Sequence, residues 1–148
     1  MTHEQTRLVK ILDWFVPNRA RPLSEVKLTR SFVFLHLFGP LMAQSIGIFL
    51  YMADPDPGLT FWVVEGSICA FWLLPFVLRA TGNLHLSAYI SVQLLTFVTL
   101  YGSFFYGGMS SPFVPWLLIA LLLGLFYLAG EYKVLLLSLA TQCMCFLG

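Results

Sequence analysis

Residues 104–116 read Phe-Phe-Tyr-Gly-Gly-Met-Ser-Ser-Pro-Phe-Val-Pro-Trp, and this stretch interrupts a long apolar run that restarts within a few residues. Gly107 and Gly108 permit backbone angles that other residues avoid, and the two prolines that follow stop a preceding helix from continuing. Aromatic residues flank the break on both sides, as they do where helices reach a membrane surface. The stretch therefore predicts a tight turn between two membrane-spanning helices, with Tyr106 and Trp116 at the headgroup level.

The composition of the whole chain agrees with this interpretation. Of its 148 residues, 59% are hydrophobic and 10% charged, whereas about a quarter of the residues of a soluble domain are charged. We therefore expect an all-α integral membrane protein, a polytopic bundle of transmembrane helices. Cys69, Cys143 and Cys145 all lie within apolar runs. They are expected to act as small hydrophobic residues and not to form a disulfide or a metal site.

Residues 1–22 are expected to form a cytoplasmic amphipathic helix followed by a basic linker. Leu8, Ile11, Leu12 and Phe15 recur at helical spacing on one face of residues 4–16. This segment is too short and too polar to cross a membrane. It either lies in the membrane interface or packs on the surface of a neighbouring protein.

Residues 23–148 are expected to form the transmembrane domain. A helix should begin near Leu23 or Ser24 and run into the first span, with a kink at Gly39-Pro40. The last span offers only about fifteen residues, fewer than the ~20 that a full crossing needs. We therefore expect about five spans with the fifth incomplete, in a chain that is a fragment or that ends at the membrane edge. The predicted spans are 31–53, 60–78, 84–106, 113–129 and 134–148.

The basic residues predict how the chain is oriented. Six of the eight lysines and arginines precede residue 31, and the other two fall in turns on the same side of the predicted bundle. The positive-inside rule places that side in the cytoplasm. The N-terminus is then cytoplasmic, and the turn at residues 107–111 lies on the outer face.

Glu65 is an ionisable residue inside the second predicted span, and such a group costs about 2.5–3.5 kcal/mol at the centre of a span. At ~1.5 Å per residue, it lies roughly 7 Å inside the outer end of its helix, at a depth close to those of Gln44 and Tyr101. We expect these three residues to form a polar cluster in the outer half of the membrane. Glu65 either holds helices together, contributes to a sensory or ligand site, or carries protons or cations. The turn above the cluster supplies the other candidate sensing or ligand residues, which are Gly107, Gly108, Ser111 and Pro112.

The histidines offer one arrangement that could hold a cofactor. His36 and His85 both fall toward the cytoplasmic leaflet, so a bis-histidine site is one alternative, and a hydrogen-bonded structural histidine is the other. The sequence contains no phosphate-binding loop, metal-spaced carboxylates or Ser-His-Asp arrangement. We therefore expect no catalytic residue, cofactor or metal. The basic N-terminal region fits anionic lipid better than nucleic acid.

Several short motifs together resemble a known family. Phe15-Val16-Pro17 ends the first helix, a basic stretch from Val26 to Arg30 leads into the first span, and an Asp-Pro turn follows that span. The turn Gly107-Gly108-Met-Ser-Ser-Pro is followed by a tryptophan. This set resembles the N-terminal membrane-sensor region of bacterial sensor histidine kinases, especially proteobacterial ones. The resemblance implies a part in a two-component system, a location in the bacterial inner (cytoplasmic) membrane, and about six spans ahead of a coiled linker and a kinase core.

Three functions follow as hypotheses. The first is a non-enzymatic sensory input domain that passes a stimulus to a cytoplasmic output domain, with the turn after residue 106 as a lid and Gly39-Pro40 as a pivot. The second is a non-catalytic accessory subunit of a larger bacterial membrane complex. The third, a small transporter, requires Glu65 to exchange protons. In each case the partners are the lipid bilayer and either a second copy of the chain or helices of a larger complex.

Overall fold

A computed structural model describes residues 3–16, 23–54 and 56–147, with side chains between residues 9 and 144 of these ranges. All regular structure in these ranges is helical, which confirms the predicted all-α class. The predicted basic linker falls largely on residues 17–22, outside the described residues. The elements are α1 (His3–Phe15), α2 (Leu23–Ala53), α3 (Leu59–Ala70), η1 (Phe71–Leu73), α4 (Leu74–Thr81), α5 (Leu84–Phe105), η2 (Gly108–Ser110), α6 (Trp116–Leu128) and α7 (Tyr132–Leu147).

Three helical stretches of the described chain are long and apolar enough to cross a membrane. These are α2 with 31 residues, the continuous stretch Leu59–Thr81 with 23, and α5 with 22. At ~1.5 Å per residue even the shortest is ~33 Å long, which covers the ~30 Å hydrocarbon core. The protein is therefore a membrane protein.

α6 is shorter than its predicted span, 113–129, whereas α7 covers nearly all of the predicted span 134–148 and begins two residues earlier. α6 has 13 residues and α7 has 16, which correspond to ~20 and ~24 Å. α6 begins at Trp116 and not at Phe113, because residues 111–115 form consecutive turns closed by hydrogen bonds from the amides of Val114 and Trp116 to the carbonyls of Ser111 and Phe113. Neither helix alone matches the thickness of a bilayer core.

Two prolines inside the long helices have different effects. α2 begins at Leu23 and continues as one α-helix through Pro40, at the position of the predicted kink. The second span tightens into the 3-10 turn η1 just ahead of Pro75. Proline has no N–H to donate to the carbonyl four residues earlier, and a short 3-10 segment is a common adjustment to such a break.

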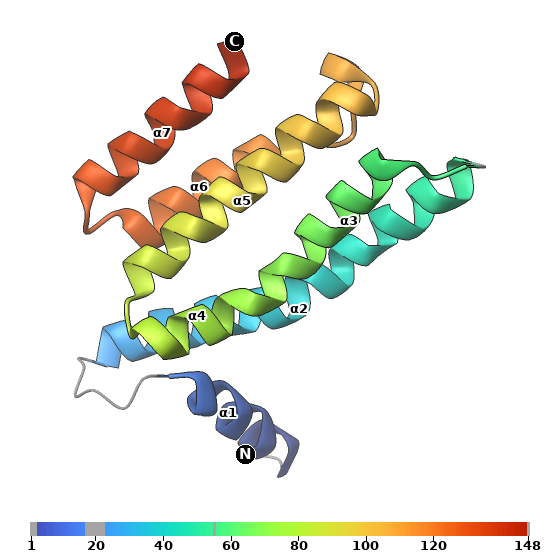
Figure 1. Ribbon diagram of the computed structural model, residues 1–148. Helices are drawn as coiled ribbons and strands as arrows, with labels where there is room; N and C mark the ends of the chain where they lie inside the picture. Colours follow the sequence, from blue (N-terminus) through green and yellow to red (C-terminus); the bar gives the residue numbers. More distant parts are fainter. Residues whose placement is uncertain (1–2, 17–22, 55, 148) are drawn as a thin grey trace.

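The membrane-crossing stretches form two pairs, with α7 outside them. In the first pair α2 packs against the continuous stretch made of α3, η1 and α4, and in the second α5 packs against α6. Figure 1 shows α2 running alongside α3 and α4, α5 alongside α6, and α7 beyond the α5–α6 pair. Buried apolar side chains form two clusters, one toward each end of the bundle. The cluster near the start of α2 contains Leu12, Phe15, Phe32, Val33, Leu74, Leu78, Leu84, Ala88, Tyr127 and Leu128. The cluster near the end of α2 contains Leu50, Phe61, Val64, Ile68, Val98 and Phe113.

α1 packs on its own chain, an arrangement that neither sequence interpretation included. Leu12 and Phe15 are buried in the first cluster against α2 and α4. The Asp13 carboxylate accepts two hydrogen bonds from the Arg30 guanidinium, at 2.6 and 2.9 Å. Ile11, which the helical pattern places on the same apolar face, is 57% exposed. The inner edge of α1 is thus fixed to the bundle, and the described residues leave Ile11 on its outer edge exposed.

Candidate functional site

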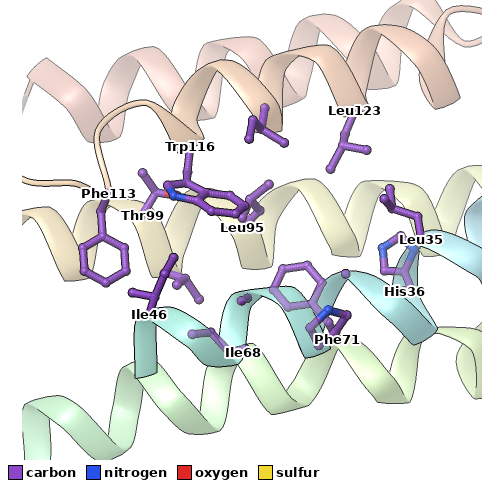
Figure 2. Close-up of a pocket in the computed structure, with 15 residues that line it drawn as sticks. Leu35, His36, Ile46, Ile68, Phe71, Leu95, Thr99, Phe113, Trp116 and Leu123 are labelled. Atoms are coloured by element: carbon purple, nitrogen blue, oxygen red, sulfur yellow. The ribbon is translucent and has the colours of Figure 1, made fainter. Parts of the chain in front are cut away.

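An apolar cavity of about 170 Å³ lies between the two helix pairs at the middle of the bundle. Figure 2 shows side chains from α2, α5 and α6 converging on it, with the Trp116 indole reaching in from α6. Trp116 is half-buried and lines this space, whereas the sequence predicts it at the headgroup level. The lining residues are Leu35, His36, Gly39, Pro40, Ala43, Ile46, Ile68, Phe71, Leu95, Val98, Thr99, Phe113, Trp116, Ile119 and Leu123.

The space exists because α2 presents small residues where it faces α5 and α6. Gly39 and Ala43 lie one turn apart on the lining face, and a methyl group added at Gly39 would meet no atom within 4 Å. Pro40 lies between them and removes the helical N–H that would bond the carbonyl of His36. This face of α2 therefore leaves room that no neighbouring side chain fills.

Thr99 supplies a hydroxyl group in a mostly apolar lining. Its side chain is fully buried, and its Oγ1 has no hydrogen-bond partner among the described residues. A water molecule in a cavity needs two to four polar partners, and apolar cavities of about 150 Å³ stay dry and bind molecules such as benzene. The cavity is thus suited to a small apolar molecule that carries at most one or two polar atoms.

The cavity lies next to a depression on the side of the bundle. Leu35, Ile119 and Leu123 line it and also line a shallow depression on the surface between α2 and α6. Leu35 is 39% exposed and Ile119 40%. In a membrane this surface faces lipid chains, so the edge of the cavity lies close to the bilayer.

His36 joins the two helix pairs at one end of the cavity. It is buried, with its Nδ1 2.7 Å from the Phe32 carbonyl and its Nε2 2.7 Å from Ser91 Oγ on α5. Because a carbonyl only accepts, we assign the proton to Nδ1, and Nε2 then accepts from the Ser91 hydroxyl. Both ring nitrogens are engaged, and no hydrogen bond links His36 to His85 among the described residues. The structural interpretation of His36 fits this geometry better than a ligand role.

Glu65 and Gln44 lie together, with Cys69 between them. Gln44 Nε2 is 3.7 Å from Cys69 Sγ, and that sulfur is 3.9 Å from Glu65 Oε1. The second carboxylate oxygen is buried without a hydrogen-bond partner among the described residues. Tyr101 makes no hydrogen bond to this group and instead stacks near Phe97 and Phe105. The predicted cluster therefore contains two of its three members, and Cys69, expected to be only a hydrophobic filler, connects them.

Gly47 explains how the Glu65 carboxyl fits between α2 and α3. A Cβ at Gly47 would overlap Glu65 Oε2. We expect Gly47→Ala to destabilise the bundle by about 1 kcal/mol, because the overlap exceeds the gain of up to about 1 kcal/mol in helix propensity. In a Glu65→Ala background the same change should be stabilising, since only the gain in propensity remains. A double-mutant cycle by equilibrium unfolding in mixed detergent micelles measures this coupling, and equal effects in both backgrounds would contradict the contact.

The predicted turn residues lie beside the cavity without lining it. Gly107 and Gly108 adopt positive φ angles of 110° and 58°, so both positions use the freedom that glycine provides. These two residues and Pro112 are exposed. Ser111 is buried, and its Oγ accepts a hydrogen bond from the amide of Phe113 at 3.3 Å. The turn thereby directs Phe113 into the core, where its ring borders the cavity.

The cavity is lined mostly by residues that the sequence did not point to, and a sensing role for the sequence-predicted residues stays a prediction. None of Glu65, Gln44, Tyr101 or the four turn residues lines the cavity, whereas His36 does. The signals that could have found it are the closely spaced Gly39, Pro40 and Ala43 on one face of α2, and Thr99 within an apolar helix. No group of three His, Cys, Asp or Glu side chains in the described ranges could hold a metal ion. No protein-family model, curated protein or solved structure matches the chain.

Proposed function

We propose that the chain is the membrane-embedded input domain of a signal-transduction protein, and that its stimulus is an apolar molecule that enters the central cavity from the bilayer. The cavity between the helix pairs carries this proposal, because it is mostly apolar, borders a depression on the lipid-facing surface, and contains a hydroxyl with no partner among the described residues. The output would be a cytoplasmic domain outside these 148 residues, such as a histidine kinase core. The resemblance of the turn and of the basic segments to sensor kinases supports the same assignment.

The mechanism is a shift of one helix pair against the other. The α2–α3–α4 and α5–α6 pairs border the cavity from opposite sides, and side-chain hydrogen bonds at His36–Ser91 and Ser31–Tyr127 join α2 to α5 and α6. A ligand that fills the cavity stabilises the packing in which the space between the two helix pairs matches the size of the ligand. It can shift the equilibrium only by its differential affinity for the two packings.

The proposal includes an orientation and a location. Lys27, Arg79 and Lys133 lie toward the end of the bundle where α2 begins, and Asp54 and Asp56 lie in the turn at the opposite end. The positive-inside rule favours a cytoplasmic position for the basic end. With the resemblance, this supports the bacterial inner membrane, and a homodimer is the expected assembly because signalling kinases act in pairs.

Binding can be tested with fluorobenzene and fluorophenol as probes. We expect both to bind the protein in nanodiscs, detected by ¹⁹F NMR, and Gly39→Leu to abolish binding because the new side chain occupies the cavity. Gly66→Leu is the matched control, since Gly66 lies on an exposed face of α3 where an added methyl group also meets no atom within 4 Å. Thr99→Val should weaken the binding of fluorophenol more than the binding of fluorobenzene. Equal binding by Gly39→Leu and the wild type would contradict the assignment of the cavity.

Signalling can be tested by joining residues 1–148 to a histidine kinase core and measuring autophosphorylation in membrane vesicles. We expect Gly39→Leu to change the basal rate and to abolish any response to the probes, while Gly66→Leu retains both. Glu65→Gln distinguishes sensing by the cavity from sensing by the Glu65 carboxyl. If the carboxyl takes part in sensing, this substitution should change kinase output without loss of membrane insertion. If no variant changes output and the chain purifies at fixed stoichiometry with a larger complex, the accessory-subunit hypothesis replaces this one.

A further inference from the structure

The outer edge of α1 is an apolar and basic surface that the described residues leave largely exposed. Lys10, Ile11 and Trp14 are exposed, Ile11 by 57% and Trp14 by 54%. Lys10 and Trp14 are four residues apart, so they lie one turn apart on the same side of the helix. Leu12 and Phe15 hold the opposite edge against the bundle. α1 therefore has one apolar edge buried against its own chain and a second edge that the described residues cover only in part.

The position of α1 is fixed relative to the end of a membrane-crossing helix. The Arg79 guanidinium, in the last turn of α4, lies 3.6 Å from the centre of the Trp14 ring and donates a hydrogen bond to the Trp14 carbonyl. The Trp14 ring also lies edge-on to Phe76 of α4, at 6.4 Å. Figure 1 shows α1 lying across the bundle near the point where α4 ends.

These contacts place Trp14 at the depth of the lipid headgroups. Phe76 is 51% exposed on a helix long enough to cross the membrane, so its ring faces lipid. Arg79 lies three residues further along, where the helix leaves the hydrocarbon. Tryptophan rings are enriched at this level, and arginine and lysine side chains there extend toward phosphates. The exposed surface of Trp14 is therefore continuous with the lipid-facing surface of α4.

The charge of this surface selects the kind of lipid. Lys10, Lys27 and Arg79 are exposed near the start of α2 and the end of α4, whereas the Asp13 carboxylate is neutralised by Arg30. A guanidinium carries five N–H donors, and the hydrogen bond described at Arg79 uses one of them. Juxtamembrane lysines and arginines attract the anionic lipids of the cytoplasmic leaflet.

We propose that α1 is an anionic-phospholipid docking helix, in which Ile11 and Trp14 enter the headgroup boundary while Lys10 and Arg79 bind lipid phosphate. The occupant is the bilayer that surrounds the bundle, since the same surface continues onto a membrane-crossing helix. This inference does not depend on the cavity or on signalling. The contact of Arg79 with Trp14 connects α1 to the end of α4.

The test is hydrogen exchange of α1 in nanodiscs that hold one copy of the chain, made of phosphatidylcholine alone or with phosphatidylglycerol. We expect exchange at α1 to slow by at least about fivefold in the anionic discs, the factor expected for one basic residue near a charged surface. High salt should remove most of this protection, because exposed charges are screened. Lys10→Gln should reduce it by about fivefold without disturbing the inner edge of α1.

Trp14→Ala should lower protection in both lipids, and Trp62→Ala is its matched control. Trp62 is 59% exposed, but it lies on α3 near the opposite end of the bundle, so its removal should leave α1 unchanged. Equal exchange of α1 in the two kinds of disc would overturn the proposal. Protection that appears only in discs with two copies, or only when a cytoplasmic protein is added, would also overturn it and assign the surface to that partner.

Discussion

Replacing His36 with alanine is expected to lower the free energy of unfolding by about 2–4 kcal/mol. The imidazole is 2% exposed, stacks on Phe32 with 3.9 Å between ring centres, and hydrogen-bonds to Ser91 on α5. Its removal enlarges a cavity that it already borders, and buried cavities are costly because the surrounding side chains relax only in part. Equilibrium unfolding in mixed detergent micelles, followed by fluorescence, measures the loss.

Two further variants separate packing from hydrogen bonding at this position. His36→Leu fills most of the same volume but cannot bond Ser91, and interhelical hydrogen bonds in membranes contribute only about 0.6 kcal/mol on average. We therefore expect it to cost less than half as much as His36→Ala. His85→Ala is the matched control, because His85 is half-buried in the first turn of α5. If His85→Ala costs as much as His36→Ala, the special place of His36 in the core is refuted.

The helical membrane fold was accessible from the sequence because long apolar runs separated by turn residues allow few alternatives. The shape of individual helices was less accessible. Pro40 and Pro75 both interrupt apolar runs, yet α2 continues through the first while η1 forms ahead of the second. Neighbouring helices determine how a membrane helix accommodates a proline. The proline alone therefore predicts that the helix is locally perturbed, but not whether it continues, bends or forms a 3-10 turn.

The candidate site was largely beyond sequence reasoning. A carboxyl within a span is a functional candidate that can be recognised in the sequence, as Glu65 is. A cavity, in contrast, is not indicated by any single residue type. It arises where small side chains of α2 face α5 and α6, and this depends on the rotation of each helix about its axis. The rise per residue along each helix predicts that Tyr101 and Glu65 lie at the same depth in the membrane. Depth does not determine the direction in which a side chain points, and no hydrogen bond joins the two residues in the described structure. Cys69 lies one turn from Glu65 on the same helix, so helical spacing could have identified that contact.

Gly102→Ala is the second change for which we expect a large effect, a net loss of up to about 2 kcal/mol after the gain in helix propensity is subtracted. A Cβ at Gly102 would lie 2.8–2.9 Å from three carbons of the Phe113 ring, closer than carbon atoms approach without strain. The ring is 3% exposed and packs in the cluster that joins α2, α3 and α5, so any shift of the ring costs contacts within that cluster. Helix propensity alone predicts that Gly102→Ala raises the free energy of unfolding, because alanine is favoured over glycine by about 1 kcal/mol within a helix. The same unfolding measurement therefore distinguishes the two effects by direction.

Gly66→Ala and a double variant test whether the Phe113 ring is the cause. An added methyl group at Gly66 meets no atom within 4 Å, so alanine there should stabilise the bundle by up to about 1 kcal/mol. Phe113→Leu presents a smaller and more flexible side chain to position 102, so it should recover part of the loss in the Gly102→Ala background. Because Phe113 also lines the cavity, a displaced ring should weaken fluorobenzene binding in Gly102→Ala even where the protein remains folded. A destabilised variant with unchanged binding would show that the strain is relieved through the backbone of residues 107–115 and not through the ring.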